Sequence, residues 1–332
     1  MIDYSDLVRV NKHIKDKIIT KENDILVCAR NGSQRLIGKN AIIKQEDANN
    51  TFGAFMMVYR ANDNPFILPL LSTKKYFSQV GENLGARINQ ITTSDFNGFE
   101  FYFPENHAER TKIAELFRLL DERIATQNKI IEDLKKLKSA IIHRCYSSQT
   151  NMIPLSELLK QCSDRNRSGS DLQVLSVSNK YGFIAQSDQF EDREVASDDT
   201  SNYKVVKKGM FAYNPARINV GSIALYEMDS NGIVSPMYVC FTTKSELLPS
   251  YLKYYFASQT FKHEMYKRLE GSVRLCLTFE ELCNIEIHLP SIEQQKNISK
   301  YISKIENNLS LVDSIFSKYQ QQRRYLLSQM FI

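Results

Sequence analysis

The sequence predicts an α+β protein in which two mixed α/β domains alternate with two long helices that pair antiparallel as a coiled coil. Its 332 residues exceed one ordinary domain and fit two. Two segments of about 40 residues each carry apolar side chains at alternating spacings of four and three, as a supercoiled helix requires. Motifs of the first half recur about 185 residues later, which predicts a pseudo-two-fold internal repeat.

Composition excludes several classes of protein. Hydrophobic residues make up 42% of the chain and charged residues 24%, which is the balance of a soluble protein with an apolar core. No apolar run approaches the ~18–20 residues of a membrane span, and the N-terminus lacks the basic and then apolar pattern of a signal peptide. We therefore expect a cytoplasmic protein without a membrane partner.

Cysteine and charge usage narrow the chemistry further. The six cysteines form no CxxC or CxxH pair, so neither a zinc site nor a disulfide framework is indicated, and we expect reduced packing residues. The net charge of +5 is mild, and the positive excess lies in residues 106–150 and 291–332. DNA contact by the remaining, globular regions would therefore depend on local clusters of Lys and Arg.

Both helical segments carry the same apolar seam. In the distal segment the seam consists of Ile298, Ile302, Ile305, Leu309, Val312, Phe316, Tyr319, Arg323, Leu326 and Met330. Subtracting 185 gives the seam of the central segment, which consists of Ile113, Phe117, Leu120, Ile124, Gln127, Ile131, Leu134, Lys138, Ile141 and Cys145. The basic interruptions Arg323 and Lys138 therefore occupy matching positions. Polar groups in a seam commonly fix the register of the helices, although contact with a partner subunit is the alternative.

The repeat extends upstream of both helices. Residues 101–104 (FYFP) correspond to residues 287–290 (IHLP), where a proline closes a strand-like run just before each helix. Residues 85–92 (GARINQIT) correspond to residues 271–278 (GSVRLCLT). The alternative is that two amphipathic helices merely follow two unrelated domains, but one offset holds from the globular motifs through the whole seam.

A duplicated unit carried on paired helices has a physical use. Antiparallel helices can hold the two globular units at opposite ends of a rigid spacer of roughly 60 Å, at 1.5 Å of rise per residue. Such a chain imitates a symmetric dimer and measures the distance between two binding sites. DNA recognition commonly uses this geometry, because half-sites lie about one helical turn or more apart, near 34 Å.

These features resemble the specificity subunits of type I restriction–modification systems over essentially the whole chain. The motifs that carry the resemblance are DILVCARNGSQRLIGKNAII at 24–43, FGAFMMVYR at 52–60, GMFAYNPARINVGSI at 209–223 and LPSIEQQKNI at 289–298. The resemblance implies two target-recognition domains that each read one half of a split site in double-stranded DNA. It also implies helices that hold these domains apart and bind two methyltransferase subunits, with restriction subunits joining through the complex.

By this resemblance, residues 1–105 and 151–290 are the target-recognition domains, and residues 106–150 and 291–332 are the central and distal spacer helices. The first domain departs from the pattern. The second unit begins near Ile153, whose counterpart at an offset of 185 would fall about 32 residues before the start of the sequence. We therefore expect the first domain to be truncated at its N-terminus, which leaves open whether it reads DNA.

DNA contacts are expected from polar, Arg-bearing loops between apolar runs. Arg presents paired donors that suit guanine, and Asn or Gln suits adenine. The candidate residues are Arg30, Asn31, Gln34, Arg35 and Arg87 in the first domain, and Arg165, Asn166, Arg167, Lys180, Tyr181, Arg217, Asn219 and Arg274 in the second. Arg87 and Arg274 belong to a basic loop that recurs in both halves. For each candidate, a solvated hairpin or a purely structural turn is the alternative.

No catalytic motif is evident. The chain has neither a G-x-x-x-x-G-K-[ST] phosphate loop nor the Asn/Asp-Pro-Pro-aromatic motif of an amino-methyltransferase, to which residues 214–217 (NPAR) are the nearest string. The five histidines are scattered and form no metal or triad set. We expect a subunit without catalytic residues, metal or cofactor of its own, and the resemblance implies a complex that depends on ATP and S-adenosylmethionine.

Two functions stay open at this point. The first is sequence-specific recognition of a bipartite DNA site, which would position the methyltransferase and restriction subunits. The second is a coiled-coil assembly scaffold, or a truncated and inactive specificity copy that assembles without reading DNA. Methylation at a two-part motif with a fixed gap would indicate the first.

Overall fold

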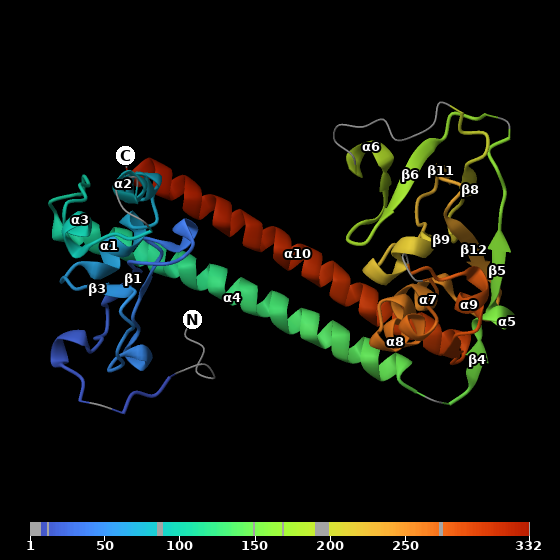
Figure 1. The fold of residues 1–332 in the computed structure, drawn as a ribbon, viewed down its shortest axis with the longest axis horizontal. Helices are drawn as coiled ribbons and strands as arrows, with labels where there is room; N and C mark the ends of the chain where they lie inside the picture. The colour runs from blue at the N-terminus through green and yellow to red at the C-terminus, as the bar shows by residue number, and fades with distance from the viewer. Residues whose placement is uncertain are drawn as a thin grey trace. The chain divides into compact units, whose positions relative to one another are not determined.

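The computed structural model describes residues 8–11, 13–84, 89–148, 150–167, 169–189, 199–271 and 275–331. The chain forms two compact units. Unit 1 comprises residues 1–130 and 312–332, and unit 2 comprises residues 131–311. Each unit mixes helices and strands, so the expected α+β class is confirmed (Figure 1).

Unit 1 places a three-stranded antiparallel sheet beside short helices. The strand order is β2-β1-β3, and β1 pairs with both neighbours. Its elements are η2 (Asp16–Ile18), β1 (Ile25–Cys28), η3 (Gln34–Leu36), β2 (Asn40–Ile42), η4 (Gln45–Asp47), β3 (Met56–Tyr59), α1 (Asn64–Leu70), α2 (Lys74–Leu84), α3 (Thr93–Asn97) and the first part of α4 (His107–Tyr146).

Alternation along β1 builds the core of unit 1. Ile25 and Val27 are fully buried, while their neighbours on the strand are half-buried, as expected where one face of a sheet packs inward. Tyr76 of α2 packs against this face and donates its hydroxyl to the Gly38 carbonyl at 2.8 Å. Gly38 has a φ of +80°, which a residue with a Cβ adopts only with strain. The glycine therefore lets the chain turn under the tyrosine.

Unit 2 contains two four-stranded sheets and a short strand pair. The sheet orders are β10-β9-β12-β5 and β7-β6-β11-β8, and β13 pairs with β4. Its elements are β4 (Met152–Pro154), α5 (Leu155–Leu158), β5 (Leu159–Cys162), β6 (Gln173–Ser178), β7 (Gly182–Ala185), α6 (Gln186–Gln189), β8 (Lys204–Val206), β9 (Phe211–Tyr213), η5 (Pro215–Val220), β10 (Ile223–Leu225), β11 (Gly232–Val234), β12 (Val239–Thr243), α7 (Pro249–Phe256), α8 (Gln259–Lys267), α9 (Phe279–Cys283), β13 (Glu286–His288) and the first part of α10 (Ile292–Met330).

Aromatic residues fill the core of unit 2. The rings of Phe211 on β9 and Phe241 on β12 stack at 5.1 Å, and Phe256 at the end of α7 meets both rings edge-on. Such packing adds to the area that each ring buries. Thr278 caps α9 by accepting a hydrogen bond from the Glu281 amide at 3.1 Å, which fixes where the helix starts.

The turn that leads into the central strand has the same geometry in both units. The Asn23 amide donates to the Ile43 carbonyl at 2.8 Å, and the Gly209 amide donates to the Tyr226 carbonyl at 2.8 Å. Asn23 and Gly209 both have a positive φ, +65° and +88°. The central strands β1 and β9 then each pair antiparallel with the next two strands of their sheet. The two units thus share one backbone plan.

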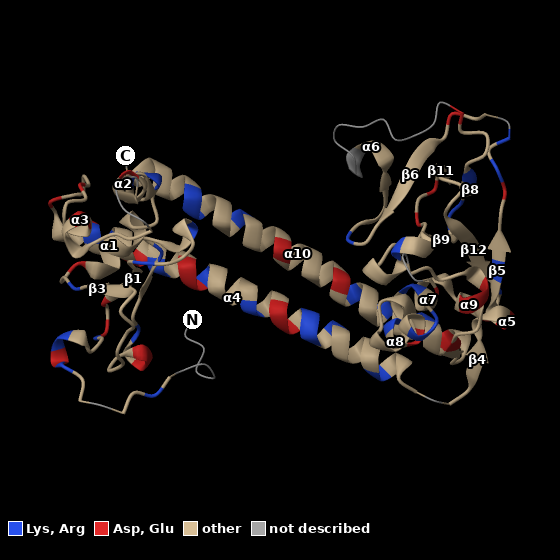
Figure 2. Ribbon diagram, viewed as in Figure 1, with Lys and Arg blue, Asp and Glu red and all other residues tan. Residues whose placement is uncertain are grey.

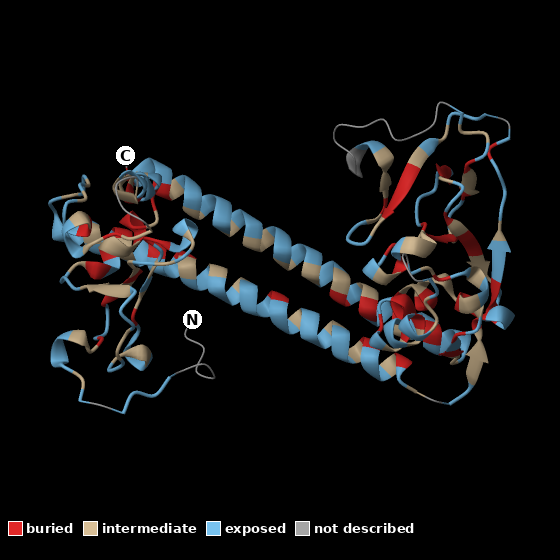
Figure 3. Cartoon of the chain, in the orientation of Figure 1, coloured by how far each residue is buried: buried red, intermediate tan, exposed pale blue. Residues whose placement is uncertain are grey.

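The long helices α4 and α10 contribute to both units. In unit 1 the Phe331 ring packs against Phe117 of α4 and Phe66 of α1, with both centroids at 5.8 Å. In unit 2 Tyr146, near the end of α4, donates its hydroxyl to the Tyr251 carbonyl of α7 at 2.7 Å. Both helices are exposed over most of their surface (Figure 3). Within each described part, an end of one long helix therefore docks on the first helix after the sheet.

One sequence expectation differs between the units. Residues 287–290 were expected to be strand-like, and Ile287 lies in β13 opposite Ile153. Residues 101–104 were expected to match them, yet no strand includes these residues in the part of the chain that the structure describes. The reason is that β13 has β4 as a partner, whereas residues 101–104 have no partner strand within the described ranges. Among the described helices, none is both long and apolar enough to cross a bilayer.

Candidate nucleic-acid interface

The first candidate loop joins β1 to β2. Arg30 is exposed, donates its amide to the Phe55 carbonyl at 3.0 Å and holds its guanidinium 5.5 Å from the centre of the Phe55 ring. Gln34 and Arg35 lie on η3 and are exposed. The aromatic ring restricts the Arg30 side chain, and an ordered guanidinium is better suited to a fixed contact than a freely rotating one.

A second segment lies against this loop. Arg30 forms a β-bridge with Gln90, and the Asn31 amide lies 3.4 Å from the Asn89 carbonyl. The Asn89 side chain in turn donates to the Gly32 carbonyl at 3.2 Å. Arg87 belongs to the same segment but lies outside the described residues. The structure therefore brings the polar loop next to the segment that carries the recurring basic residue.

Asn31 has partly committed its side chain. Its Oδ1 accepts a hydrogen bond from the Ser33 amide at 2.9 Å, which shapes the loop as an Asx turn. Its amide NH₂ is the group left to contact another molecule. Gln34 and Arg35 have their whole polar ends exposed, so they have more freedom than Asn31 to reach a base edge.

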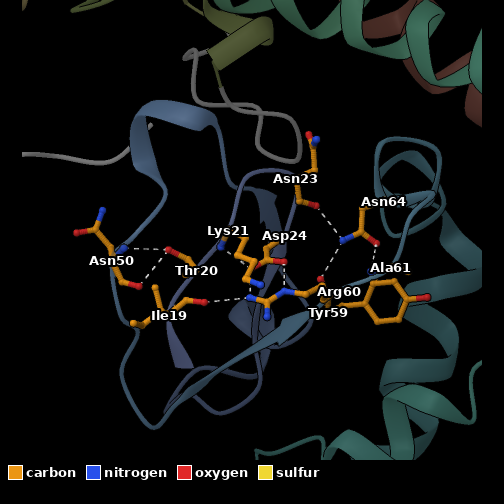
Figure 4. Close-up of polar contacts among 10 residues, drawn as sticks. All are labelled: Ile19, Thr20, Lys21, Asn23, Asp24, Asn50, Tyr59, Arg60, Ala61 and Asn64. Carbon is orange, nitrogen blue, oxygen red and sulfur yellow. Dashed lines mark hydrogen bonds and ion pairs between the residues drawn. The ribbon is translucent and has the colours of Figure 1, made fainter. Parts of the chain in front are cut away.

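A buried ion pair holds the opposite end of β1 (Figure 4). The Arg60 guanidinium donates to both carboxylate oxygens of Asp24 at 2.6 Å and to the Ile19 carbonyl at 3.0 Å. Burial by itself raises the pKa of Asp24, but the hydrogen bonds from Arg60 and the Lys21 amide outweigh it and the pKa is lowered. The buried Asn64 side chain bonds Asn23, Tyr59 and Ala61 beside this pair. These contacts fix the sheet that carries the loop.

In unit 2 two loops with candidate residues lie side by side. Lys180 and Tyr181 form the exposed turn between β6 and β7, where basic colour marks the ribbon in Figure 2. The Lys180 ammonium lies 4.8 Å from the centre of the Tyr181 ring, and a hydrogen bond to Tyr181 raises the pKa of Lys180. A Cβ built on Gly221, which ends η5, would lie 3.3 Å from the Cβ of Asn179 in this turn. The η5 loop and the β6–β7 turn are therefore in contact.

The η5 loop carries Arg217 and Asn219. Arg217 is exposed, and Asn219 is half-buried with its carbonyl 3.4 Å from the Tyr266 hydroxyl. Asn214 caps η5 by accepting a hydrogen bond from the Ala216 amide at 3.1 Å. Gly221, with a φ of +93°, ends it. Arg217 thus projects from a short helix that is fixed at both ends.

The same hydrogen bond ties both loops to the segment before the next helix. In unit 1 the Ile91 amide donates to the Ala29 carbonyl at 2.9 Å, and in unit 2 the Leu277 amide donates to the Pro215 carbonyl at 3.1 Å. Each bond lies two to three residues before a Thr N-cap, at Thr92 and Thr278. Arg274 precedes Leu277 and lies outside the described residues, like Arg87. Each unit therefore builds the same corner from one loop and one following segment.

Arg165, Asn166 and Arg167 lie elsewhere in unit 2. Arg165 forms a bridge with Lys204 of β8, and β8 is the edge of its sheet opposite β7. Asn166 is buried, and its side-chain amide bonds the backbone of Ser170 in both directions, at 2.9 and 3.2 Å. This geometry favours a structural role for Asn166. Arg167 is exposed, whereas Arg165 donates to the Asn202 side chain at 2.9 Å.

Charge at the corner is positive and uncompensated. Arg30, Arg35 and Arg217 form no ion pair within the described ranges. Exposed cations without carboxylate partners are the electrostatic signature of a phosphate-binding surface. Phe55 and Tyr266 also belong to these corners, as exposed aromatic residues next to the basic loops. Sequence reasoning missed them, because an isolated aromatic residue in a loop carries no periodic signal.

The polar seam residues form ion pairs between the long helices. In unit 2 the Lys138 ammonium lies 2.5 Å from the Glu306 carboxylate, which also accepts a hydrogen bond from Tyr254 at 2.9 Å. In unit 1 Arg323 donates to both carboxylate oxygens of Asp121, at 2.5 and 3.2 Å. These contacts make both basic seam residues interhelical partners, as a role in register requires.

Chemistry at other sites is limited in the described structure. No group of three or more His, Cys, Asp or Glu side chains that could hold a metal ion is present among the described residues. The six cysteines are unpaired, and burial raises the pKa of the Cys240 thiol to about 12, so it stays protonated. These observations agree with a binding role.

Comparison with known proteins decides the family. The model of the type I restriction modification DNA specificity domain matches residues 5–136 and again residues 165–315. The chain belongs to this family. Two matches in one chain cover most of its length, and each includes one of the basic corners. The chain is therefore a DNA specificity subunit of a type I restriction–modification system, in a family whose members carry no catalytic site.

Individual relatives agree with this assignment. The chain is 24% identical to the specificity subunit of the type I restriction enzyme MjaVIII from Methanocaldococcus jannaschii, over 89% of this chain and 75% of that protein. Its fold resembles the type I restriction–modification S subunit from M. genitalium, with a TM-score of 0.62, 18% identity, and coverage of 97% and 86% of the two chains. A chain from a structure on complex assembly and conformational transition of the type I system aligns with a TM-score of 0.51 and 14% identity over 96% and 84% of the two chains.

Proposed function

We propose that this specificity subunit reads a bipartite site in double-stranded DNA, with one half-site for each unit. The observation that carries the proposal is the repeated corner, in which a basic loop is tied by one hydrogen bond to the segment before a Thr-capped helix. A protein that presents the same surface twice is suited to a site with two parts. Residues 1–105 and 151–290 would be the two target-recognition domains.

The proposed DNA contacts differ in kind. Arg30, Gln34 and Arg35 of unit 1 and Arg217, Lys180 and Tyr181 of unit 2 are exposed at the corners and are the proposed base or groove contacts. Asn31, Asn219, Arg87 and Arg274 belong to the same loops and segments and are proposed as supporting contacts. Arg165 and Arg167, beyond the other edge of the sheet, are better suited to phosphates, which position a protein without reading sequence.

The spacer is proposed to be an antiparallel coiled coil with pseudo-two-fold symmetry. Lys138 and Arg323 stand at matching positions of the repeat, and so do their partners Glu306 and Asp121, 185 residues apart. Each basic residue pairs with the acidic residue of the other helix, as symmetry-related pairs would. The buried or half-buried seam residues on both helices support the same arrangement.

The proposed partners follow from the family. Two methyltransferase subunits would bind the spacer helices, and restriction subunits would join through the complex, which would use ATP and S-adenosylmethionine supplied by those subunits. The chain would act in the cytoplasm, where it would need no cofactor of its own.

Deletion of one heptad from each long helix tests the spacer and the bipartite reading together. Co-expressed with its methyltransferase subunit, the natural chain should direct methylation to a two-part motif with a fixed gap, and the shortened chain should change that gap. The matched control replaces the same heptads with others of equal length and seam pattern, and should keep the gap. An unchanged gap after deletion contradicts the spacer, and assembly without any methylated motif favours the scaffold alternative.

A further inference from the structure

Unit 1 has an apolar hollow beside residues 99–103. Its volume is about 920 Å³, and its lining includes the aromatic side chains of Tyr59, Phe96, Phe99 and Phe101. The neighbouring Tyr102 and Phe103 are exposed, by 82% and 53%. Grouped exposed aromatic residues commonly mark a surface that another segment covers.

The equivalent surface of unit 2 is covered by the segment that opens that unit. There β4 pairs with β13, Ile153 lying opposite Ile287, and β5 pairs with the edge of β12. Between the two strands, Leu155, Leu158 and Leu159 enter the core and are at most 5% exposed. A strand, one helical turn and a second strand thus seal the unit.

The counterparts of these two strand edges are unoccupied in unit 1, as far as the described residues show. β3 is the last strand of its sheet, and no described strand pairs with residues 99–103. One side of this stretch is satisfied, because Gln79 bonds the Glu100 amide at 2.8 Å and its carbonyl at 3.2 Å. In unit 2 the Glu286 carbonyl faces Tyr255 in the same way, at 3.2 Å, and the other side of β13 accepts β4. The open side of residues 99–103 is therefore the one that would accept a strand.

The first ten residues have the sequence of such a segment. Residues 1–10 read MIDYSDLVRV, and residues 152–161 of unit 2 read MIPLSELLKQ. Met, Ile, Ser and Leu are identical at their positions, and an acidic and a basic residue match as well. Tyr4, Leu7 and Val8 stand where Leu155, Leu158 and Leu159 are buried in unit 2.

We propose that residues 1–10 dock on unit 1 as a strand, a turn and a second strand, with Ile2 opposite Phe101 and Tyr4, Leu7 and Val8 in the hollow. Residues 1–7 lie outside the described residues, and Val8, the first described residue, is 87% exposed where it now lies. An exposed apolar segment and an uncovered apolar hollow in one unit complement each other.

The chain is long enough for this docking. The Ile19 carbonyl already accepts a hydrogen bond from Arg60, which follows β3 directly (Figure 4). The docked second strand would end near β3, at residue 10 or 11. The eight or nine residues from there to Ile19 can span roughly 25 Å when extended, at about 3.3 Å per residue, which is more than the connection requires.

This docking changes where the two units differ. The expectation of a missing opening segment rests on one offset, whereas residues 1–10 match residues 152–161 at a shorter one. Residues 11–16 of unit 1 then stand where unit 2 has residues 162–202, which include β6 and β7. Unit 1 would be complete at its opening and would have no counterpart of the Lys180–Tyr181 turn. The proposal concerns folding of unit 1 and does not depend on which DNA is read.

A disulfide trap tests the register in the full chain. By analogy with Pro154 opposite Glu286, Asp3 should lie opposite Glu100, in a narrow antiparallel pair with Cα atoms about 4.5 Å apart, which suits a disulfide. Asp3→Cys with Glu100→Cys should form an intrachain disulfide under mild oxidation, assigned by peptide mass mapping. The matched control, Asp6→Cys with Glu100→Cys, is three residues out of register and should form little.

Three outcomes would overturn the proposal. They are equal cross-linking of both variants, absence of the Asp3–Glu100 bond, and a bond only between two chains, which would make a second copy the occupant. Hydrogen exchange gives an independent reading, since Leu7→Asp should reduce amide protection at residues 99–103 at least tenfold. The control Ser5→Asp, at the position of exposed Ser156, should leave protection unchanged. Loss of the methylated motif with the cross-link intact would refute DNA reading and leave this docking in place.

Discussion

Lys138 of α4 and Glu306 of α10 form an interhelical ion pair at 2.5 Å, and each has its repeat counterpart in the pair of Arg323 with Asp121. All four residues lie in or beside the apolar seams. The relationship identifies what the basic interruptions of the two seams do. They choose one alignment of the helices over its neighbours, because a slip of one turn would separate each cation from its carboxylate.

A double-mutant cycle measures this pair. Lys138→Met and Glu306→Gln, alone and together, should give a coupling of about 0.5–1 kcal/mol in urea unfolding, since both side chains are about one third exposed. Gln keeps an acceptor for the Tyr254 hydroxyl. The coupling should shrink in 1 M salt. The exposed Arg118–Glu122 pair within α4 serves as the control and should couple less strongly. No coupling at low salt would leave the register without this contact.

Substitutions at the corners should affect the two half-sites separately. Arg217→Ala should weaken recognition of one half of the motif, and Arg35→Ala should weaken the other, each by about 1–3 kcal/mol, or roughly tenfold to a hundredfold. Methylation mapping of the complex with each variant measures this. Lys44→Ala, which removes an exposed lysine beside Glu46, is the control and should leave the motif intact. Equal effects of both arginine variants on both halves would contradict the assignment of one half-site to each unit.

Asn166 should behave as a structural residue. Asn166→Ala removes both hydrogen bonds to the Ser170 backbone and should destabilise unit 2 by about 1–2 kcal/mol in urea unfolding, without changing the methylated motif. Arg167→Ala, next to it but exposed, should leave stability unchanged and lower DNA affinity, with a smaller salt dependence. An altered motif with unaltered stability in Asn166→Ala would instead make this amide a reader.

The Asp24–Arg60 pair should make unit 1 sensitive to acid. Hydrogen bonds to the carboxylate lower the pKa of Asp24 below the value near 3.9 of an unfolded chain. The pair therefore contributes stability above about pH 4, and this contribution is lost as the pH falls through the folded pKa. Asp24→Asn should cost about 1–2 kcal/mol at pH 7, since Arg60 is partly exposed.

Urea unfolding of both forms between pH 7 and pH 3 measures the effect. The advantage of the natural chain over Asp24→Asn should be constant down to about pH 5 and should shrink below pH 4. Glu46→Gln removes an exposed carboxylate and should change stability little at any pH in this range. A difference that grows with acid would mean that Asp24 is not stabilised in its charged form.

The sequence by itself determined the plan of this protein. The seam positions and their offset of 185 residues located both long helices, because helical periodicity is a local property of the chain. The Arg-bearing loops were found for a similar reason, since they interrupt apolar runs that build β1, β2, β9 and β10. Family membership follows from these same repeated motifs.

Only the tertiary structure decided which candidate side chains are available. Arg217 and Asn166 look alike in sequence as polar loop residues, yet one is exposed on η5 and the other is buried by bonds to Ser170. Contacts such as Arg30 with Phe55, or Asn31 with Asn89, join residues far apart in the chain. Such pairings depend on how the sheet and its loops pack together, and no local pattern encodes them.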